Sequence, residues 1–529
     1  MALGPHHHAL LRVDLILRTS NNRVKFRDYS QEDTMCRTVR GNLPTVLVLS
    51  CMLLLPNVVL AANHYVKAGA AGSGSGVDWT NAYANLPASM VRGDIYYVAA
   101  GKYNGHTFND ATSGTAVITI KAATVADHGT DTGWLASYVG QASFNTDAGG
   151  GIFVFNQPYY VIDGQYRNSD EISGYGFHLN NYNGCTPVTS CAPAISTNAV
   201  VNLSSHDITI RYADVEGSHD QRSSSCGSGH SCDENVQDFT NGNILIEYSY
   251  LHDAGEAGFK LRGSSTSSGS GGLVNFTVQY SYIARNWSQG GGLVHSEAFS
   301  TSDGVQNFVV RYNKFVDIRG TGVIATASGS CYSGCPNYNR GNGPWYIYGN
   351  QWWYSNPTVT YCDVGGFVSL WDVGFLGSIY VYNNTIAHVN SSVCNDGGSG
   401  GDATVNGQGL VQAHLGSNSL IVRNNIWYNS GGGVSITLAD GTVVQDHNDT
   451  NASSSLFAND SSHDYHLVEN DTSFSGSSPF GDVLSNVSGQ TFNVDPDGTT
   501  RSTWDVGAYE LAASGGKPSA PAGLTAAVR

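Results

Sequence analysis

A short pattern of apolar and polar positions recurs along this chain, with copies spaced by tens of residues. Each copy reads as apolar-x-β-branched, then a small residue or Asn, then an apolar residue. Eight copies begin near Pro158, Asp207, Asn243, Asn275, Asn307, Pro344, Ser378 and Ser419. Within a copy, apolar and polar residues alternate with a period of two, which predicts strands. Self-similarity at this spacing is typical of a solenoid, so we expect stacked coils built from strands.

Three positions of each copy hold the same type of residue throughout, and the prediction depends on them. The third step is β-branched, at Val161, Ile210, Ile246, Val278, Val310, Ile347, Val381 and Val422. The sixth step is small or Asn, at Gly164, Ala213, Ser249, Ser281, Asn313, Asn350, Asn384 and Asn425. The eighth step is a large apolar residue, at Tyr166, Val215, Leu251, Ile283, Phe315, Trp352, Ile386 and Trp427. Asn tolerates left-handed backbone, so the sixth step is expected at a tight bend, with stacked Asn side chains bonding from coil to coil.

The copy that begins at Asn307 shows how one repeat forms one coil. Phe308 and Val310 alternate with Val309 and Arg311, as in a half-buried strand. Phe315 resumes the inward series after the bend, and a third short strand is expected at Val323. A single coil cannot bury its apolar face, but stacking buries it and pairs every strand in parallel with the next coil. We therefore predict an all-β, right-handed parallel β-helix. The alternative, a β-sandwich, needs hairpins, whereas the Asn-Gly pairs here mostly fall in long excursions.

The composition narrows the class of protein. Charged residues make up 13% of the chain, which also contains 64 Gly and 29 Tyr. This balance is typical of a secreted β-solenoid. The formal net charge of −17 does not indicate the basic surface that nucleic-acid-binding proteins use, so nucleic acid is not expected as a partner. An acidic surface is compatible with calcium sites and with plain solubility, of which solubility is the more frequent explanation.

Residues 1–62 are expected to lie outside the fold. Arg37 and Arg40 precede an apolar run that ends in a small-residue site beside Ala61 or Ala62, which indicates a secretory signal peptide. Its n-region would be far too long for a start at Met1, so residues 1–34 are interpreted as a mis-called start. No later stretch is long enough to span a membrane. We expect a secreted monomer.

The cysteines fit an oxidising compartment. Eight of the ten cysteines follow the cleavage site, in Gly/Ser-rich loops, at Cys185, Cys191, Cys226, Cys232, Cys331, Cys335, Cys362 and Cys394. Disulfides within the three close pairs are the expectation, although the sequence does not fix the connectivity. Zinc is the alternative for these pairs.

Both ends of the repeat region resemble a known group of proteins. From His64 the chain reads as a strand, a Gly-rich turn, a short helix around Asn81 to Val91 and a strand ending "VAAGKY". This resembles the N-terminal entry of secreted right-handed β-helix proteins of the pectate-lyase-like superfamily, which implies a cap on the open end. "DVGAYEL", from Asp505 to Leu511, resembles the closing strand of bacterial members.

These resemblances set the expected domain limits. The β-helix domain is placed at residues 63–511. In residues 512–529, "PSAPAGLTA" resembles the opening strand of a fibronectin type III module, so this segment is expected to be a linker or the start of a truncated module. A plain tail is the alternative.

Candidate chemistry gathers on the third strands of two central coils. Lys260 and Arg262 alternate with inward Phe259 and Leu261, and the next coil carries His295 and Glu297. If the strands stack in register, these four groups share one outward patch. Asp253 and Glu256 lie on the corner before Lys260, and Asp233 and Glu234 follow the Cys226–Cys232 loop and are placed to reach the same patch. The plain alternative is a set of solvated strand and turn residues, with Glu297 merely paired to Arg262.

Tryptophans offer candidate platforms for sugar rings. Trp345 and Trp352 occupy inward repeat positions and are assigned to the core. Trp353 and Trp371 remain as candidates for substrate binding.

The resemblance implies a polysaccharide lyase that cleaves a uronic-acid polymer by β-elimination. Relatives in that superfamily use Lys and Arg as base and acid, with acidic ligands that hold calcium against the substrate carboxylate. By residue type, Lys260, Arg262, His295 and Glu297 are the candidate catalytic residues, and Asp253 and Glu256 the candidate calcium ligands. Two alternatives stay open: a glycoside hydrolase using Glu297 with Asp253 or Asp233, and a non-catalytic polysaccharide-binding solenoid or adhesin.

Overall fold

The computed structural model describes residues 61–145, 151–180, 199–217, 234–238, 242–254, 257–262, 273–286, 297–302, 305–318, 322–327, 343–355, 366–371, 374–375, 377–389, 403–405, 413–430, 432–434, 438–468, 484, 490–502 and 504–511. The chain divides into two compact units, Met1–Leu60 and Ala61–Arg529, and all described residues belong to the second. The expected signal sequence up to Leu60, the eight loop cysteines and residues 512–529 lie outside the described residues.

Three long sheets make up the described part of the second unit. Sheet A contains β1 (Asn63–Val66), β2 (Ile95–Val98), β5 (Ile118–Ala122), β8 (Tyr160–Asp163), β11 (Ile208–Arg211), β14 (Ile244–Glu247), β17 (Leu273–Gln279), β20 (Val305–Arg311), β23 (Trp345–Tyr348), β26 (Ile379–Tyr382), β29 (Ala413–Arg423) and β32 (Leu438–Asp446). Sheet B contains β3 (Gly101–Asn104), β6 (Ala142–Asn145), β9 (Phe177–Asn180), β12 (Ala213–Glu216), β15 (Tyr250–His252), β18 (Tyr282–Ala284), β21 (Lys314–Val316), β24 (Gln351–Trp353), β27 (Thr385–Ala387) and β30 (Ile426–Tyr428). Sheet C contains β4 (His106–Phe108), β7 (Phe153–Phe155), β10 (Val201–Leu203), β13 (Glu234–Asp238), β16 (Ala257–Arg262), β19 (Phe299–Ser302), β22 (Gly322–Ala327), β25 (Gly366–Trp371), β28 (Ala403–Val405) and β31 (Gly432–Val434).

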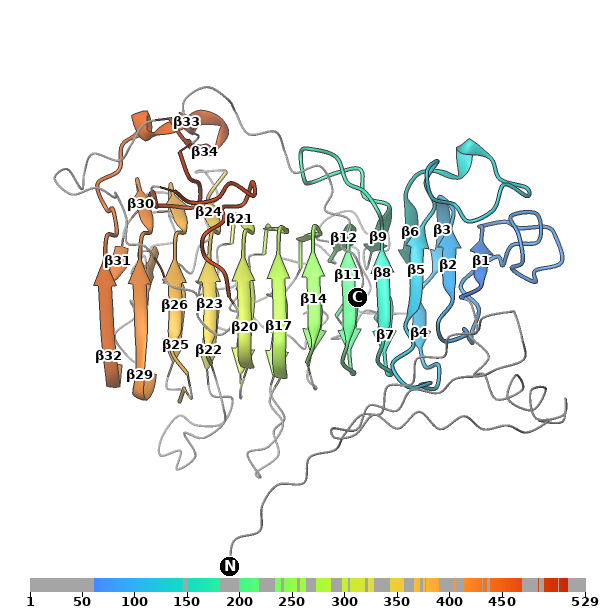
Figure 1. Cartoon of the computed structure of the whole chain (residues 1–529), viewed down its shortest axis with the longest axis horizontal. Helices are drawn as coiled ribbons and strands as arrows, with labels where there is room; N and C mark the ends of the chain where they lie inside the picture. Colours follow the sequence, from blue (N-terminus) through green and yellow to red (C-terminus); the bar gives the residue numbers. More distant parts are fainter. Residues whose placement is uncertain are drawn as a thin grey trace, which may run out of the picture. The chain divides into compact units, whose positions relative to one another are not determined.

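The chain visits the three sheets in turn, one strand in each, and then begins the next coil. From β2 onward, strands that are neighbours in a sheet are therefore three apart in chain order, and they pair in parallel, as in β14 with β17. The first strand, β1, pairs directly with β2 in sheet A. Figure 1 shows the strands of sheet A side by side from β1 to β32. This confirms the predicted parallel β-helix. Outside the three sheets, the described residues hold an antiparallel pair, β33 (Phe457–Asn459) and β34 (Asp464–Leu467), and three 3-10 turns, Ala136–Tyr138, Ser454–Leu456 and Asp460–Ser462.

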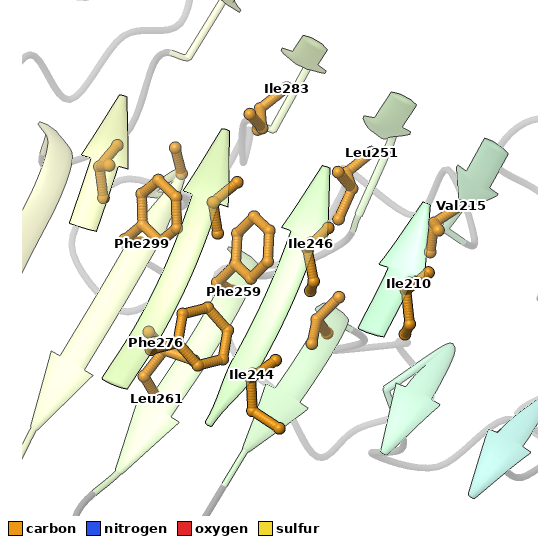
Figure 2. Close-up of a cluster of buried hydrophobic side chains, with 14 of the residues drawn as sticks. Ile210, Val215, Ile244, Ile246, Leu251, Phe259, Leu261, Phe276, Ile283 and Phe299 are labelled. Carbon is orange, nitrogen blue, oxygen red and sulfur yellow. The ribbon is translucent and has the colours of Figure 1, made fainter. Parts of the chain in front are cut away.

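The core lies between the three sheets and is built from the predicted inward rows. Ile246 aligns with Val278, and Val278 with Val310, and all three are buried. Figure 2 shows Ile246 of sheet A, Leu251 of sheet B and Phe259 of sheet C within one apolar cluster. Full burial of such a side chain contributes about 1.5–3 kcal/mol, so the repeated rows dominate the stability of the solenoid. Within the described residues, no helix has both the length and the hydrophobicity required to cross a membrane.

The sixth repeat position forms the predicted asparagine ladder. Asn313 donates to Asn350 (3.1 Å), Asn350 to Asn384 (3.0 Å) and Asn384 to Asn425 (2.9 Å), all between buried side-chain amides. The expectation of left-handed backbone at these residues was wrong by one position. Positive φ occurs at the residue before, as at Tyr312 (58°) and Asn383 (51°). The ladder residues act instead through their side chains, which form hydrogen bonds with buried backbone groups at the corner.

The first copy of the repeat was placed one residue out of register. Ile162, and not Val161, aligns with Ile210, while Val161 aligns with Thr209. Tyr159 adopts the left-handed corner conformation (φ 66°), and a shift of one residue exchanges the inward and outward faces of a strand. The eighth-step position falls to Leu179, which aligns with Val215, because residues 164–176 form an excursion before β9.

The expected helix around Asn81 to Val91 is absent from this described segment, which consists of turns and a bridge from Tyr83 to Val66. The Asp78 carboxylate accepts a hydrogen bond from the Asn81 amide (2.7 Å), which favours a turn. Pro87 also lacks the amide that a helix would use. Two apolar side chains of the segment, Leu86 and Met90, pack into the main core.

The C-terminal segment packs against the outside of sheet B. Residues 505–511 were expected to close the helix as a strand, but they form irregular structure. The Ala508 amide donates to the Thr385 hydroxyl of β27 (2.9 Å), and Asn383 donates to the Asp505 carbonyl (2.9 Å). The Glu510 carboxylate accepts from the amide of Asp505 (3.1 Å), so polar groups are satisfied within the segment and not by strand pairing.

Candidate functional site

The predicted patch on sheet C centres on an ion pair. Lys260 occupies an outward position of β16, and its Nζ lies 2.7 Å from Oε1 of Glu234, the first residue of the neighbouring β13. The Lys260 side chain is 19% exposed and the Glu234 side chain 3%. The expectation that Glu234 reaches this patch is confirmed. A contact this short requires a proton between the two atoms, so Lys260 acts here as a cation beside a carboxylate.

The row that runs across the strands through Lys260 carries small or polar residues. The register aligns Gln237, Lys260, Ser300, Ala325 and Ser369 on successive strands. Strands in a sheet lie about 4.8 Å apart, and exposure falls along this row, because Ala325 (8%) and Ser369 (2%) are buried.

A second row passes through Arg262, two residues further along β16. The register aligns Arg262, Ser302, Ala327 and Trp371. Two of the predicted site residues, Arg262 and Trp371, therefore share one row three strand spacings apart. Their side chains lie outside the described part of the chain.

The register places Glu297 away from the row of Lys260. Phe299 aligns with Phe259, so Ser300 and Ser302 stand opposite Lys260 and Arg262. The pairing is set by the core, where the rings of Phe259 and Phe299 stack at 4.5 Å. The expected shared row of Lys260, Arg262, His295 and Glu297 was thus out of register. Glu297 is buried (5% exposed) at the corner before β19, and His295 lies outside the described residues.

Trp353 does not present a free face. Its side chain is 5% exposed, because Tyr465 and His463 of the C-terminal segment pack on it with ring centroids 5.8 and 5.5 Å away. The expectation of a sugar platform at Trp353 is therefore wrong. The sequence could not reveal this, because the covering residues lie more than a hundred positions further along the chain.

Asp253 is enclosed by cations at the corner after β15. Its Oδ2 lies 2.5 Å from Nδ1 of His252, and Nε of Arg285 donates to its Oδ1 (2.9 Å). His252 Nε2 contacts Oδ1 of Asp214 on the neighbouring strand (2.8 Å), and Arg285 also donates to the Tyr250 hydroxyl (2.6 Å). Asp253 and His252 are both buried.

The charges of this network stabilise one another. Burial alone raises the pKa of the Asp253 carboxyl, but hydrogen bonds from His252 and Arg285 outweigh burial and lower that pKa to about 2. Burial lowers the pKa of His252, whereas its hydrogen bonds to Asp214 and Asp253 outweigh burial and raise it above the usual value. The network therefore favours protonated His252 between two carboxylates. This arrangement suits a structural role and does not leave His252 available as a general base.

The described contacts do not favour Asp253 as a calcium ligand. The two oxygens of its carboxylate already face a guanidinium and an imidazolium, whose positive charges oppose a metal ion at the same position. The other expected ligand, Glu256, lies outside the described residues. Among the residues that the structure describes, no group of three or more His, Cys, Asp or Glu is arranged to hold a metal. The calcium site stays a prediction.

Sequence reasoning missed the residues that engage Asp253. His252 and Arg285 stand at the ends of the second strands of two successive coils, in "YLHD" and "YIAR". His252 aligns with Ala284, so Arg285 is the equivalent of Asp253 in the next coil. This equivalence was the available signal, because equivalent positions of neighbouring coils lie one strand spacing apart.

Comparison with known proteins gives a limited result. No family model matches the chain, and no curated protein matches it. Among solved structures the chain is similar to the "Crystal structure of pectate lyase Pel9A", with 14% sequence identity and a TM-score of 0.41, over 86% of this chain and 98% of that chain. The fold assignment rests on the pairing of the three sheets.

Proposed function

We propose that the protein is an extracellular enzyme that cleaves a uronic-acid polysaccharide by β-elimination on the outer face of sheet C. The observation that carries the proposal is the Glu234–Lys260 pair, in which the outward ammonium of Lys260 lies 2.7 Å from the buried carboxylate of Glu234 at the start of β13. Among the neighbouring outward residues, Ser300 is small and partly exposed, whereas Ala325 is 8% exposed, so we place the polymer over β16 and β19.

The pair supplies two of the three requirements of the reaction. Elimination needs a positive charge against the uronate carboxylate, a base for the C5 proton and a proton for the leaving oxygen. The ion pair changes the expected roles, because Lys260 already holds a proton: its ammonium faces the uronate carboxylate, and Glu234 becomes the base. The C5 proton passes to Glu234, the C–H electron pair forms the C4–C5 double bond as the C4–O bond breaks, and the departing oxygen takes a proton from water. The hydroxide formed from that water then takes the proton from Glu234 and restores the carboxylate. Arg262 is retained as a second cation on the same strand.

The test is a set of three variants assayed on pectate, alginate and glycosaminoglycans. Lys260→Ala and Glu234→Gln should each lower the rate of formation of the ultraviolet-absorbing product by at least about 100-fold, with the circular dichroism spectrum of the folded protein retained. Lys260→Ala should also lower the melting temperature, because it removes the ammonium that faces the buried Glu234 carboxylate. Lys121→Ala is the matched control, since Lys121 forms an ion pair with Asp127 (2.5 Å) on sheet A. Loss of activity on chelation, restored by calcium, would support the calcium prediction. A Lys260→Ala protein with full activity would refute the proposed site.

A glycoside hydrolase is the second candidate, because Glu234 and Glu297 fall in one row. Glu234 aligns with Ala257, and Glu297 precedes Phe299 by two residues as Ala257 precedes Phe259. The two carboxylates are thus two strand spacings apart, about 9.6 Å, near the upper end of the range for inverting hydrolases. Reducing ends without the ultraviolet product, lost in Glu297→Gln, would favour this activity. Binding without either product would favour a non-catalytic solenoid.

A further inference from the structure

A second set of reactive side chains lies on the outer face of sheet B, in the coils that precede the Glu234–Lys260 pair. The register aligns Lys102, Ser143, His178 and Asp214 on the successive strands β3, β6, β9 and β12. All four occupy outward positions, because they alternate with core residues such as Phe144 and Leu179. Neighbours in this row are therefore one strand spacing apart, about 4.8 Å.

The contacts in this row follow the order of a nucleophile, a base and an orienting carboxylate. Ser143 Oγ lies 3.5 Å from Nδ1 of His178. The other ring nitrogen of His178, Nε2, lies 2.8 Å from Oε2 of Glu216. Asn180 Nδ2 donates to the same carboxylate oxygen (2.6 Å) and so fixes its position. Glu216 can only accept at Nε2, which places the imidazole proton there and leaves the Nδ1 lone pair facing the serine hydroxyl.

We propose that Ser143, His178 and Glu216 form an esterase site that removes short acyl groups from carbohydrate. Ser143 is the nucleophile, His178 the general base, and Glu216 the residue that positions and charge-balances the imidazole. The same three roles recur on unrelated folds, and they are recognised by geometry and not by chain order. Here they come from three adjacent strands of one sheet.

Another residue of this row and one further row indicate the chemical class of the substrate. Lys102, exposed beside Ser143, places an ammonium where negative charge develops on the ester carbonyl oxygen. Asn104, Asn145 and Asn180 align two residues further along the same strands. This amide row suits the hydroxyl groups of a sugar. The site is an outward sheet face and not an apolar tunnel, so a short acyl group such as acetyl fits it better than a fatty acyl chain.

The reaction balances without a cofactor. Ser143 Oγ attacks the ester carbonyl carbon while its proton moves to Nδ1 of His178. The tetrahedral intermediate collapses by breaking the bond to the sugar oxygen, which takes the proton from His178. Water then attacks the acyl-serine with His178 again as base, and releases the carboxylic acid and free Ser143.

The full chain is tested with p-nitrophenyl acetate, with an O-acetylated polysaccharide, and with a fluorophosphonate that labels activated serines. We expect acetate release, and labelling that maps to Ser143. Ser143→Ala and His178→Gln should lower kcat/KM by at least about 100-fold and abolish the label. Glu216→Gln should lower kcat by at least about tenfold with KM unchanged, which a purely structural role would not produce.

Two controls separate this site from other parts of the protein. His414→Ala removes a histidine paired with Asp440 (3.0 Å) at the C-terminal end of the solenoid, and should leave hydrolysis unchanged. Lys260→Ala should also keep full esterase activity, so failure of the proposed lyase site and failure of this site are distinguishable. The inference is overturned if the wild-type chain hydrolyses neither ester faster than buffer, if the label maps elsewhere, or if Ser143→Ala retains the wild-type rate.

Discussion

Replacement of Asn350 by alanine removes one rung from the buried asparagine ladder. The Asn350 side chain accepts a hydrogen bond from the Asn313 amide (3.0 Å) and donates to the Val310 carbonyl (2.9 Å). Asn350 is fully buried, so water does not replace these bonds. A buried backbone group left without its partner costs about 1–3 kcal/mol, and two such groups predict a loss of about 2–6 kcal/mol in the free energy of unfolding.

The loss is measured by urea unfolding of the full chain, followed by tryptophan fluorescence and circular dichroism. Asn275→Gly is the matched control, since Asn275 belongs to a solvent-exposed ladder, bonds to Asn243 (2.7 Å), and has a φ of 59° that glycine also adopts. The control should lose about 1 kcal/mol or less, because water replaces its bonds. An Asn350→Ala variant within about 0.5 kcal/mol of the wild type, or one no less stable than the control, would refute the reasoning.

Three further substitutions test other parts of the structure. The pKa of folded His252 is raised above its usual 6.5, so its ion pairs stabilise the fold fully below pH 6.5, and this stabilisation is lost as the pH rises through the folded pKa. The loss of unfolding free energy in His252→Gln should therefore be largest near pH 5 and smaller in alkaline buffer. An equal loss at every pH would contradict this. Trp353→Ala should lower stability by about 3–5 kcal/mol without changing polysaccharide affinity, in unfolding and binding assays, whereas lost affinity at unchanged stability would restore the sugar platform. Gly349→Ala should lower the melting temperature more than Gly416→Ala: both glycines have positive φ, but only at Gly349 would a Cβ meet a neighbour, the Tyr312 ring at 2.5 Å, so equal shifts would argue against the clash.

The repeat pattern was sufficient to predict the coil. The rows through Ile246 and Leu251 follow from alternation with period two, and stacking of equivalent positions follows from the repeat itself. The prediction of the strand register failed where two adjacent residues fitted the pattern equally well. Val161 and Ile162 are adjacent β-branched residues, and only the pairing with the next strand decides which one is buried.

The candidate site was predicted less well, for physical reasons. The contact between Lys260 and Glu234 was anticipated because Glu234 directly follows the Cys226–Cys232 loop and begins the strand next to that of Lys260, although the residue aligned with Lys260 is Gln237. The burial of Trp353 depends on a segment that returns from the far end of the chain, and no local pattern reports such a contact. Glu297 was misplaced because the inward Phe299, and not the preceding polar residues, sets where its strand begins.

The most direct test of the proposed function is the mass of the fragments that the protein releases from a uronic-acid polymer. Elimination at the Glu234–Lys260 face predicts fragments whose new non-reducing end is lighter by one water and absorbs in the ultraviolet, with both signals lost in Lys260→Ala and kept in Lys121→Ala. Fragments that carry the added water, or an intact polymer in the presence of active wild-type protein, would contradict the lyase assignment.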